Sequence, residues 1–256
     1  MTTKQEIIKR YDSLAQKRHL WKRRNKYYYK DQLKYFRFLV PEGLSVLELG
    51  CGTGDLLNGL NPERGVGIDL SKNMLDIAQK KYPHLEFKHQ DIEEIKYWDE
   101  KFDVIIIADV IGHLFDIEQT LGLLHDFCKP ETRLIISYYN FFWEPVLKLG
   151  ELLGLKMPQQ YQNWLSSDDI SNFLTLSDFQ VVKEESRLLV PKNIFFLGSV
   201  INRYFGTIPG IRKMCLCRYV IARSMQKKRV KEYSTTVLIP CRNEKGNIES
   251  CVKRLP

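Results

Sequence analysis

The sequence has no apolar run that approaches the roughly 20 residues needed to span a bilayer. Its opening residues, MTTKQEIIKRYDS, also lack the apolar stretch of a secretory signal. We therefore predict a cytoplasmic protein. Its 256 residues are 44% hydrophobic, which is enough to build a sizeable core.

Cysteines with metal-binding spacing are absent as well. The six cysteines, at positions 51, 128, 215, 217, 241 and 251, form no C-x-x-C motif and have no histidine cluster near them. This pattern gives no signal for a zinc site or for a disulfide framework. We predict reduced, mostly buried thiols and no metal site.

Acidic residues are missing from residues 203–231, which carry nine basic ones. Residues 1–40 have a net charge of +9, whereas residues 41–202 have a net charge of −11. An acidic body with basic ends predicts that the ends meet something anionic, such as phosphate, nucleic acid or a membrane surface. The alternative is solubilising charge on exposed helices.

Short aliphatic runs alternate with helical patterns through most of the chain. Residues 4–39 have helical spacing without Gly or Pro, and Ser71 is placed to cap a later helix. We expect strands over 44–49, 65–70, 85–91, 102–109, 132–140, 179–190 and 216–224, and further helices over 55–60, 71–82, 117–128 and 166–176. The alternation predicts an α/β fold, a parallel sheet with helices on both faces.

The segment LELGCGTGD places glycines between the first strand and the next helix. Gly50, Gly52 and Gly54, with Cys51 between them, let the chain turn sharply and let a ligand lie against bare backbone. Their G-x-G-x-G spacing differs from the G-x-G-x-x-G of dinucleotide-binding dehydrogenases, which counts against NAD. Asp69 ends the next strand, and a carboxylate there can accept hydrogen bonds from both hydroxyls of a ribose.

Three further residues near the strand ends are candidates for the same ligand. Asp91 ends the third strand and is a natural partner for an adenine amino group, with Ile92 packing on the ring. The alternative role of Asp91 is to cap a helix. Glu48, just before the glycines, either faces a cationic part of the ligand or fixes the loop.

In these residues the chain resembles the class I S-adenosylmethionine-dependent methyltransferases over about residues 25–224. The resemblance implies a Rossmann-like sheet of seven strands, mostly parallel, in which the last strand inserts antiparallel beside residues 132–140. It implies S-adenosylmethionine as the cofactor. It also implies that Leu70 and Met74 flank the adenine and that Ala108 and Asp109 lie near the methionine part.

We predict three parts. They are a basic helical cap over residues 1–40, the methyltransferase domain over 41–224, and a linker with the truncated start of a glycosyltransferase-like domain over 225–256. Residues 234–256 resemble the start of a family-two glycosyltransferase, with VLIP followed by Asn243 and Glu244. The Asp-x-Asp motif of that family is absent. We therefore expect no glycosyl transfer by this chain, and a glycosyltransferase domain as its partner in a longer, bifunctional protein.

Because a sulfonium methyl is already electrophilic, such an enzyme needs few catalytic side chains. His113, after the fourth strand, is the candidate base, with Asp109 and His89 as further candidates; a capping or packing role is the alternative for His113. The N/D-P-P-Y signature of amide and adenine nitrogen methylation is absent. We predict an oxygen or carbon acceptor on a small molecule, and the segment 234–256 suggests a sugar, a glycolipid or a lipid-linked intermediate.

Two other functions compete with this prediction. The basic, tyrosine-rich segment KRHLWKRRNKYYYK suits RNA binding, with or without methylation, but no recognisable RNA-binding module accompanies it, so nucleic acid is the weaker hypothesis. The other is a cofactor-binding scaffold without activity. Separately, residues 193–214 combine Phe, Ile and Leu with Arg and Lys, which predicts either a lid over the acceptor or an element that lies on anionic lipid.

Overall fold

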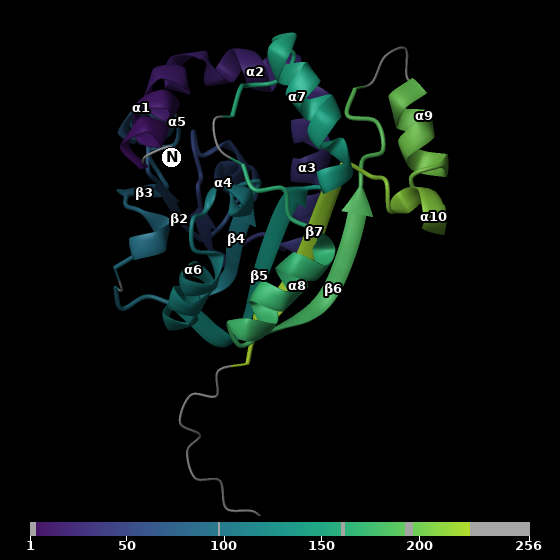
Figure 1. Ribbon diagram of the computed structural model, residues 1–256. Coiled ribbons are helices and arrows are strands. Elements are labelled where there is room, and N and C mark those ends of the chain that lie inside the picture. Colours follow the sequence, from purple (N-terminus) through teal and green to yellow (C-terminus); the bar gives the residue numbers. More distant parts are fainter. Residues whose placement is uncertain (1–3, 97, 160–161, 193–196, 226–256) are drawn as a thin grey trace, which may run out of the picture. The chain divides into compact units, whose positions relative to one another are not determined.

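Seven strands form one sheet in the order β3-β2-β1-β4-β5-β7-β6, shown in Figure 1. β7 pairs antiparallel with β5 and β6, and the remaining neighbours pair in parallel. The strands are β1 (Ser45–Leu49), β2 (Arg64–Asp69), β3 (Glu86–His89), β4 (Phe102–Ala108), β5 (Cys128–Tyr139), β6 (Phe179–Arg187) and β7 (Cys217–Ser224). The predicted α/β fold is confirmed, including the antiparallel place of the last strand beside β5.

Alternate residues of the central strands point to opposite faces of the sheet, as the two-residue period of a strand requires. On one face Leu47 and Ile105 pack with Leu121 of α6 and Leu174 of α8. On the other face Val46, Val104 and Ile106 pack with residues of α3 and α4. Because both faces are covered, the central strands are continuous aliphatic runs.

Helices connect the strands and form the two outer layers in Figure 1. They are α1 (Lys4–Leu14), α2 (Arg18–Arg24), α3 (Lys26–Leu39), α4 (Asp55–Gly59), α5 (Lys72–Lys81), α6 (Ile117–Leu123), α7 (Glu144–Leu152), α8 (Ser167–Leu176), α9 (Leu197–Tyr204) and α10 (Pro209–Arg212). The Ser71 hydroxyl caps α5 by accepting from Met74 N, as predicted. Ser166 caps α8 in a reciprocal capping box with Asp169.

This computed structural model describes residues 4–96, 98–159, 162–192 and 197–225, which fall within one compact unit, Met1–Gln226. The predicted basic cap over residues 1–40 therefore shares a unit with the sheet. A second unit comprises Lys227–Pro256. The predicted linker and glycosyltransferase-like segment over 225–256 lie, except for Met225, outside the described residues.

The N-terminal helices lie against the sheet through buried aromatic side chains of α3. Tyr28, Tyr35 and Phe36 are buried, and Tyr35 and Phe36 make edge contacts with the Tyr219 ring of β7. The helical segment predicted over residues 4–39 is confirmed, with a 3₁₀ turn at Ala15–Lys17 and a break at Asn25. Its aromatic residues therefore belong in part to the core.

The described cysteines, Cys51, Cys128, Cys215 and Cys217, are buried free thiols, as predicted. Within the described part of the chain no group of three or more metal-binding side chains occurs. Among these residues no helix has both the length and the apolar character needed to cross a membrane.

Candidate active site

The glycine loop connects β1 to α4 in left-handed backbone conformations. Gly50, Gly52 and Gly54 have φ angles of 74°, 54° and 71°, which side chains rarely adopt. A Cβ at Gly50 would lie 2.4 Å from the Val110 Cγ2, and one at Gly52 would lie 3.0 Å from the Arg18 Nη2. The loop therefore has glycines for both conformation and space, and Arg18 lies directly over it.

Asp69, at the end of β2, fixes this loop from the neighbouring strand. One carboxylate oxygen accepts from Gly52 N at 2.7 Å, and the other accepts from Ser71 N at 2.9 Å. Burial raises the pKa of Asp69, and these two hydrogen bonds oppose the rise. Each oxygen keeps a further lone pair for a ligand.

Glu48, at the end of β1, is buried on the α4 side of the sheet. Its carboxyl group accepts from Leu57 N at 3.0 Å, and burial raises its pKa to about 8. This contact holds α4 to the strand, as expected if Glu48 fixes the loop. Glu48 also borders the cavity described next.

A cavity of about 490 Å³ opens at the carboxyl ends of β1, β2, β4 and β5. Ligands of open α/β sheets bind at this edge. Every residue predicted to contact the cofactor lines this cavity except Gly54, and the candidate base His113 lines it as well. The lining cofactor candidates are Glu48, Gly50, Cys51, Gly52, Asp69, Leu70, Met74, Asp91, Ile92, Ala108 and Asp109. Gly54 instead lies against the Phe87 and Tyr82 rings.

Asp91 lies at the side of this cavity that is closed by α1. Its carboxylate accepts from Glu93 N at 2.9 Å, capping a short 3₁₀ helix at Ile92–Glu94, and forms an ion pair with Lys4. The neighbouring Ile92 and Met74 are almost fully buried. Asp91 thus has the capping contact that was the alternative prediction, and it still lines the cavity.

Arg18 of α2 projects into the same cavity, and sequence reasoning missed it. Its Nε is buried without a hydrogen-bond partner among the described residues. Burial alone would lower the pKa of Arg18, but the surrounding Tyr29 and Asp69 outweigh burial and raise it. A charged guanidinium with an unused donor, beside a bare glycine loop, suits an anionic group of a ligand.

A second cation of α2 is paired within the protein. Lys22 donates to the Asp55 carboxylate at 2.5 Å, and Lys81 and Tyr82 donate to the other Asp55 oxygen. Burial lowers the pKa of Lys22 to about 8. Asp55 therefore connects α2, α4 and α5 around the glycine loop.

We expect Asp55→Asn to destabilise the protein in a way that depends on pH. Burial alone would raise the pKa of Asp55, but Lys22 and then Lys81 outweigh it and hold the pKa well below its usual range. The resulting stabilisation is complete above the unfolded pKa of about 4 and is lost as the pH falls toward the folded pKa. Urea unfolding should show a loss of about 1 to 3 kcal/mol at pH 7 that shrinks below about pH 4. An equal loss at pH 7 and pH 3 would contradict this role.

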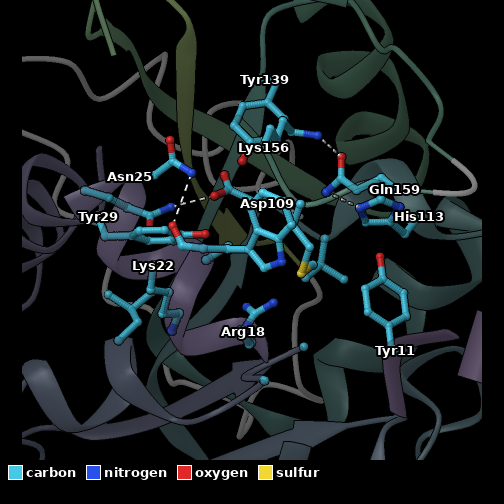
Figure 2. A pocket seen from close by; sticks show the side chains of 18 of the residues that line it. Tyr11, Arg18, Lys22, Asn25, Tyr29, Asp109, His113, Tyr139, Lys156 and Gln159 are labelled. Atoms are coloured by element: carbon cyan, nitrogen blue, oxygen red, sulfur yellow. Dashed lines mark hydrogen bonds between the residues drawn. The ribbon is translucent and has the colours of Figure 1, made fainter. Parts of the chain in front are cut away.

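Opposite Arg18, three polar side chains form a chain of contacts, drawn as dashed lines in Figure 2. The Lys156 ammonium donates to Glu151 and, at 2.6 Å, to Gln159 Oε1. Gln159 Nε2 lies 3.3 Å from His113 Nε2. Because an ammonium only donates, the Gln159 amide oxygen faces Lys156, and the amide nitrogen therefore faces His113.

Aromatic rings enclose this polar chain. The Tyr11 ring meets His113 edge-on with centroids 6.3 Å apart, and Lys156 lies 5.6 Å above the centre of the Tyr139 ring. Burial lowers the pKa of Lys156, and the Glu151 carboxylate opposes this change. Tyr11, His113, Tyr139, Lys156 and Gln159 form what we call the acceptor wall (Figure 2).

Asp109 lines the cavity beside this wall and has a left-handed conformation, with φ of 58°. Its carboxylate accepts from Tyr28 at 2.5 Å, from Gln32 at 2.8 Å and from Ser137 at 2.9 Å. Burial raises its pKa, and the three hydrogen bonds oppose the rise. These contacts fasten α3 to β4 and β5, which accounts for the buried carboxyl. His89, the other candidate base, does not line the cavity, and its ring lies 2.9 Å from the Leu70 carbonyl.

Comparison with known proteins assigns more than half of this chain to a family. The family model described as "Methyltransferase domain" matches residues 20–184. Demethylmenaquinone methyltransferase of Lactobacillus johnsonii is 31% identical over 46% of this chain and 53% of its own length. The enzyme of that name from Halalkalibacterium halodurans is 28% identical over 65% of this chain and 75% of its own. The match thus spans about half of the first relative and three quarters of the second.

A solved structure shares the fold. A Thermotoga maritima S-adenosylmethionine-dependent methyltransferase, described as a possible histamine N-methyltransferase, superposes with a TM-score of 0.65. It is 16% identical, and the match covers 85% of this chain and 99% of that one. At this identity the likeness establishes the architecture and leaves the acceptor open.

Proposed function

This chain belongs to the S-adenosylmethionine-dependent methyltransferases, and from that premise we propose that it methylates an oxygen or carbon of a small molecule bound against the acceptor wall. The observation that carries the proposal is the shared cavity. The glycine loop and Asp69 line one side of it, and His113, Gln159 and Lys156 line the other.

The residues present fit the cofactor. Asp69 offers two carboxylate oxygens to the ribose hydroxyls, and Gly50 and Gly52 line the part of the cavity beside Arg18 that we assign to the amino-acid end. The unpartnered Arg18 Nε supports a role in holding the cofactor's carboxylate. Met74 and Ile92 supply the apolar walls of an adenine site.

When bound, S-adenosylmethionine supplies an electrophilic methyl group. The protein then has to orient the acceptor, exclude water and accept a proton. We assign proton acceptance to His113, whose Nε2 can take the proton when the acceptor hydroxyl replaces the Gln159 amide that lies 3.3 Å from it. Gln159 acts as a positioning residue, since it touches the histidine and holds its ring.

The acceptor wall favours a planar, partly apolar acceptor that carries an acidic hydroxyl. Tyr11 and Tyr139 offer ring surfaces for stacking. The nearby Lys156 charge would stabilise a phenolate or enolate, which reacts at either oxygen or the adjacent carbon. The relatives named for demethylmenaquinone suggest a quinol as the first compound to try. The test is transfer of labelled methyl from S-adenosylmethionine to a panel of quinols, phenols and glycosides, and no labelled product from any class would contradict the proposal.

We expect His113→Ala to lower kcat by about 10² to 10⁴, because it removes the proton acceptor. Affinity for S-adenosylhomocysteine should stay within about twofold, since the histidine lies on the acceptor side. The matched control is His84→Ala, which removes an exposed histidine outside the cavity. Gln159→Leu should lower kcat with little change in KM, because it removes the contact that holds the histidine ring, whereas a purely structural glutamine would leave kcat in place.

Three sequence predictions remain proposals beside this one. A sugar or lipid-linked sugar acceptor is suggested by residues 234–256, and the glycosides in the panel test it. RNA binding is less favoured, because Arg18 and Lys22 of the basic segment line the cavity. A gel shift with tRNA at low salt would restore that alternative. Product formation would exclude a scaffold without activity.

A further inference from the structure

Helix α9 exposes apolar side chains to solvent and turns a polar side chain toward the protein, which is the opposite of the usual arrangement in a surface helix. Its polar Asn202 faces the protein, where the side chain donates to Tyr27 at 3.1 Å and bonds the backbone of Val190. Leu197, Val200 and Tyr204, spaced three and four apart, are about half or more exposed. Surface helices normally bury the apolar stripe and expose the polar one.

Helix α7 presents apolar side chains at the same end of the sheet. Leu149, Leu152 and Leu153 are 55%, 83% and 62% exposed. Trp143, just before α7, donates through Nε1 to the Met214 carbonyl at 2.7 Å, so the segment that follows α10 contacts the start of α7. In Figure 1 both helices lie at the end where β5 and β6 finish.

Positive charge accompanies these apolar residues. Residues 197–214 contain Arg203, Arg212 and Lys213 and no acidic residue. Arg212 pairs with Glu185, while Arg203 and Lys213 are exposed without an acidic partner among the described residues. Exposed apolar side chains beside basic ones are the composition of an element that lies in a lipid interface.

None of the described residues 197–214 lines the cavity. A lid over the acceptor, the alternative for residues 193–214, stays a prediction. Helix α7, in contrast, lines the cavity through Val146, Leu147 and Gly150. Its Leu149 and Leu152 are exposed to solvent. One wall of the cavity is therefore the inner side of a helix whose outer side is apolar.

We propose that the exposed faces of α7 and of residues 197–214, here called the interfacial surface, dock on an anionic phospholipid bilayer. The leucines and Tyr204 enter the interface, and Arg203 and Lys213 meet the headgroups. The proposal concerns a lipid partner and holds whatever the acceptor is.

The test is co-sedimentation of the full chain with vesicles of phosphatidylcholine alone and with phosphatidylglycerol added. We expect binding to the anionic vesicles that weakens with salt. Leu152→Asp should lower the partition constant at least ~10-fold by placing a charge in the apolar interface. Arg203→Glu should lower it by about tenfold on anionic vesicles only.

The matched control is Leu176→Asp. Leu152 and Leu176 each end a helix and are strongly exposed, but Leu176 lies beside the start of β6, away from α7. This variant should bind vesicles like the wild type. Thermal melts should match for both aspartate variants. No vesicle binding at low salt, or equal loss in both variants, would overturn the proposal, as would a dimer in solution that Leu152→Asp dissociates, because a second copy would then cover the surface.

Discussion

Replacing Arg18 with methionine is expected to weaken binding of S-adenosylhomocysteine by about 100-fold, or about 2.7 kcal/mol. The guanidinium lies over Gly52 and has a buried Nε without a partner. Charge-assisted hydrogen bonds to a carboxylate are the strong ones, so their loss should dominate the measured affinity. Isothermal titration with the full chain measures this directly.

The same substitution should change the stability of the free protein little, because two effects oppose each other. Methionine removes the cost of a buried Nε donor without a hydrogen-bond partner, but it also removes the favourable interaction of the guanidinium charge with Asp69. Adenosine, which has no carboxylate, should bind Arg18→Met and the wild type equally. Arg23→Met, an exposed position on the same helix, is the control. Unchanged affinity for S-adenosylhomocysteine in Arg18→Met would show that Arg18 does not contact the ligand.

Asp69→Asn is expected to weaken both S-adenosylhomocysteine and adenosine by at least ~100-fold. The substitution removes the charge and puts an amide donor in place of one carboxylate oxygen, so that in either orientation it opposes Gly52 N or Ser71 N and, we propose, one of the ribose hydroxyls. Opposed donors at this point also disturb the loop, so the free protein should lose about 1 to 3 kcal/mol of unfolding free energy.

The affinity for adenosine distinguishes Asp69→Asn from Arg18→Met. Loss of adenosine binding in Asp69→Asn, with normal binding in Arg18→Met, would assign the carboxylate to the sugar and the guanidinium to the amino-acid end. The control for the amide change is Asp76→Asn, which lies exposed on α5. Adenosine binding that survives in Asp69→Asn at wild-type strength would remove the ribose contact.

The fold and the cofactor side of the cavity were predictable because their signals are local. Glycines at 50, 52 and 54 follow a strand and precede a helix, and Asp69 follows one strand later. In a parallel sheet these strand ends meet at one edge, so sequence order alone brings them together. The alternation of short aliphatic runs with helical patterns is also a local signal, and it predicts the sheet with helices on both faces.

The site residues that the sequence analysis did not identify owe their positions to packing that no local sequence pattern encodes. Arg18 belongs to a basic segment that resembles solvated charge, and its role follows from the way α2 crosses the glycine loop. Lys156 and Gln159 lie in an irregular stretch without a periodic signal, and Glu151 on α7 holds the lysine there. The wall is identified by the contacts of Lys156 with Glu151 and Gln159 and by the contact of Gln159 with His113.

Asp109 shows the reverse case, a residue whose position was predictable and whose contacts were not. Its place after β4 made it a candidate for chemistry. The contacts with Tyr28, Gln32 and Ser137 come from three other points of the chain. A carboxylate that accepts three protein hydrogen bonds is better suited to holding α3 in place than to exchanging protons with a substrate.

The most direct measurement is a crystal structure of the full chain grown with S-adenosylhomocysteine. We expect the sugar hydroxyls on Asp69, the amino-acid end over Gly50 and Gly52, the carboxylate on Arg18, and the sulfur turned toward His113. A cavity without the ligand, with Arg18 instead paired to Asp69 or Asp55, would contradict this assignment of the site.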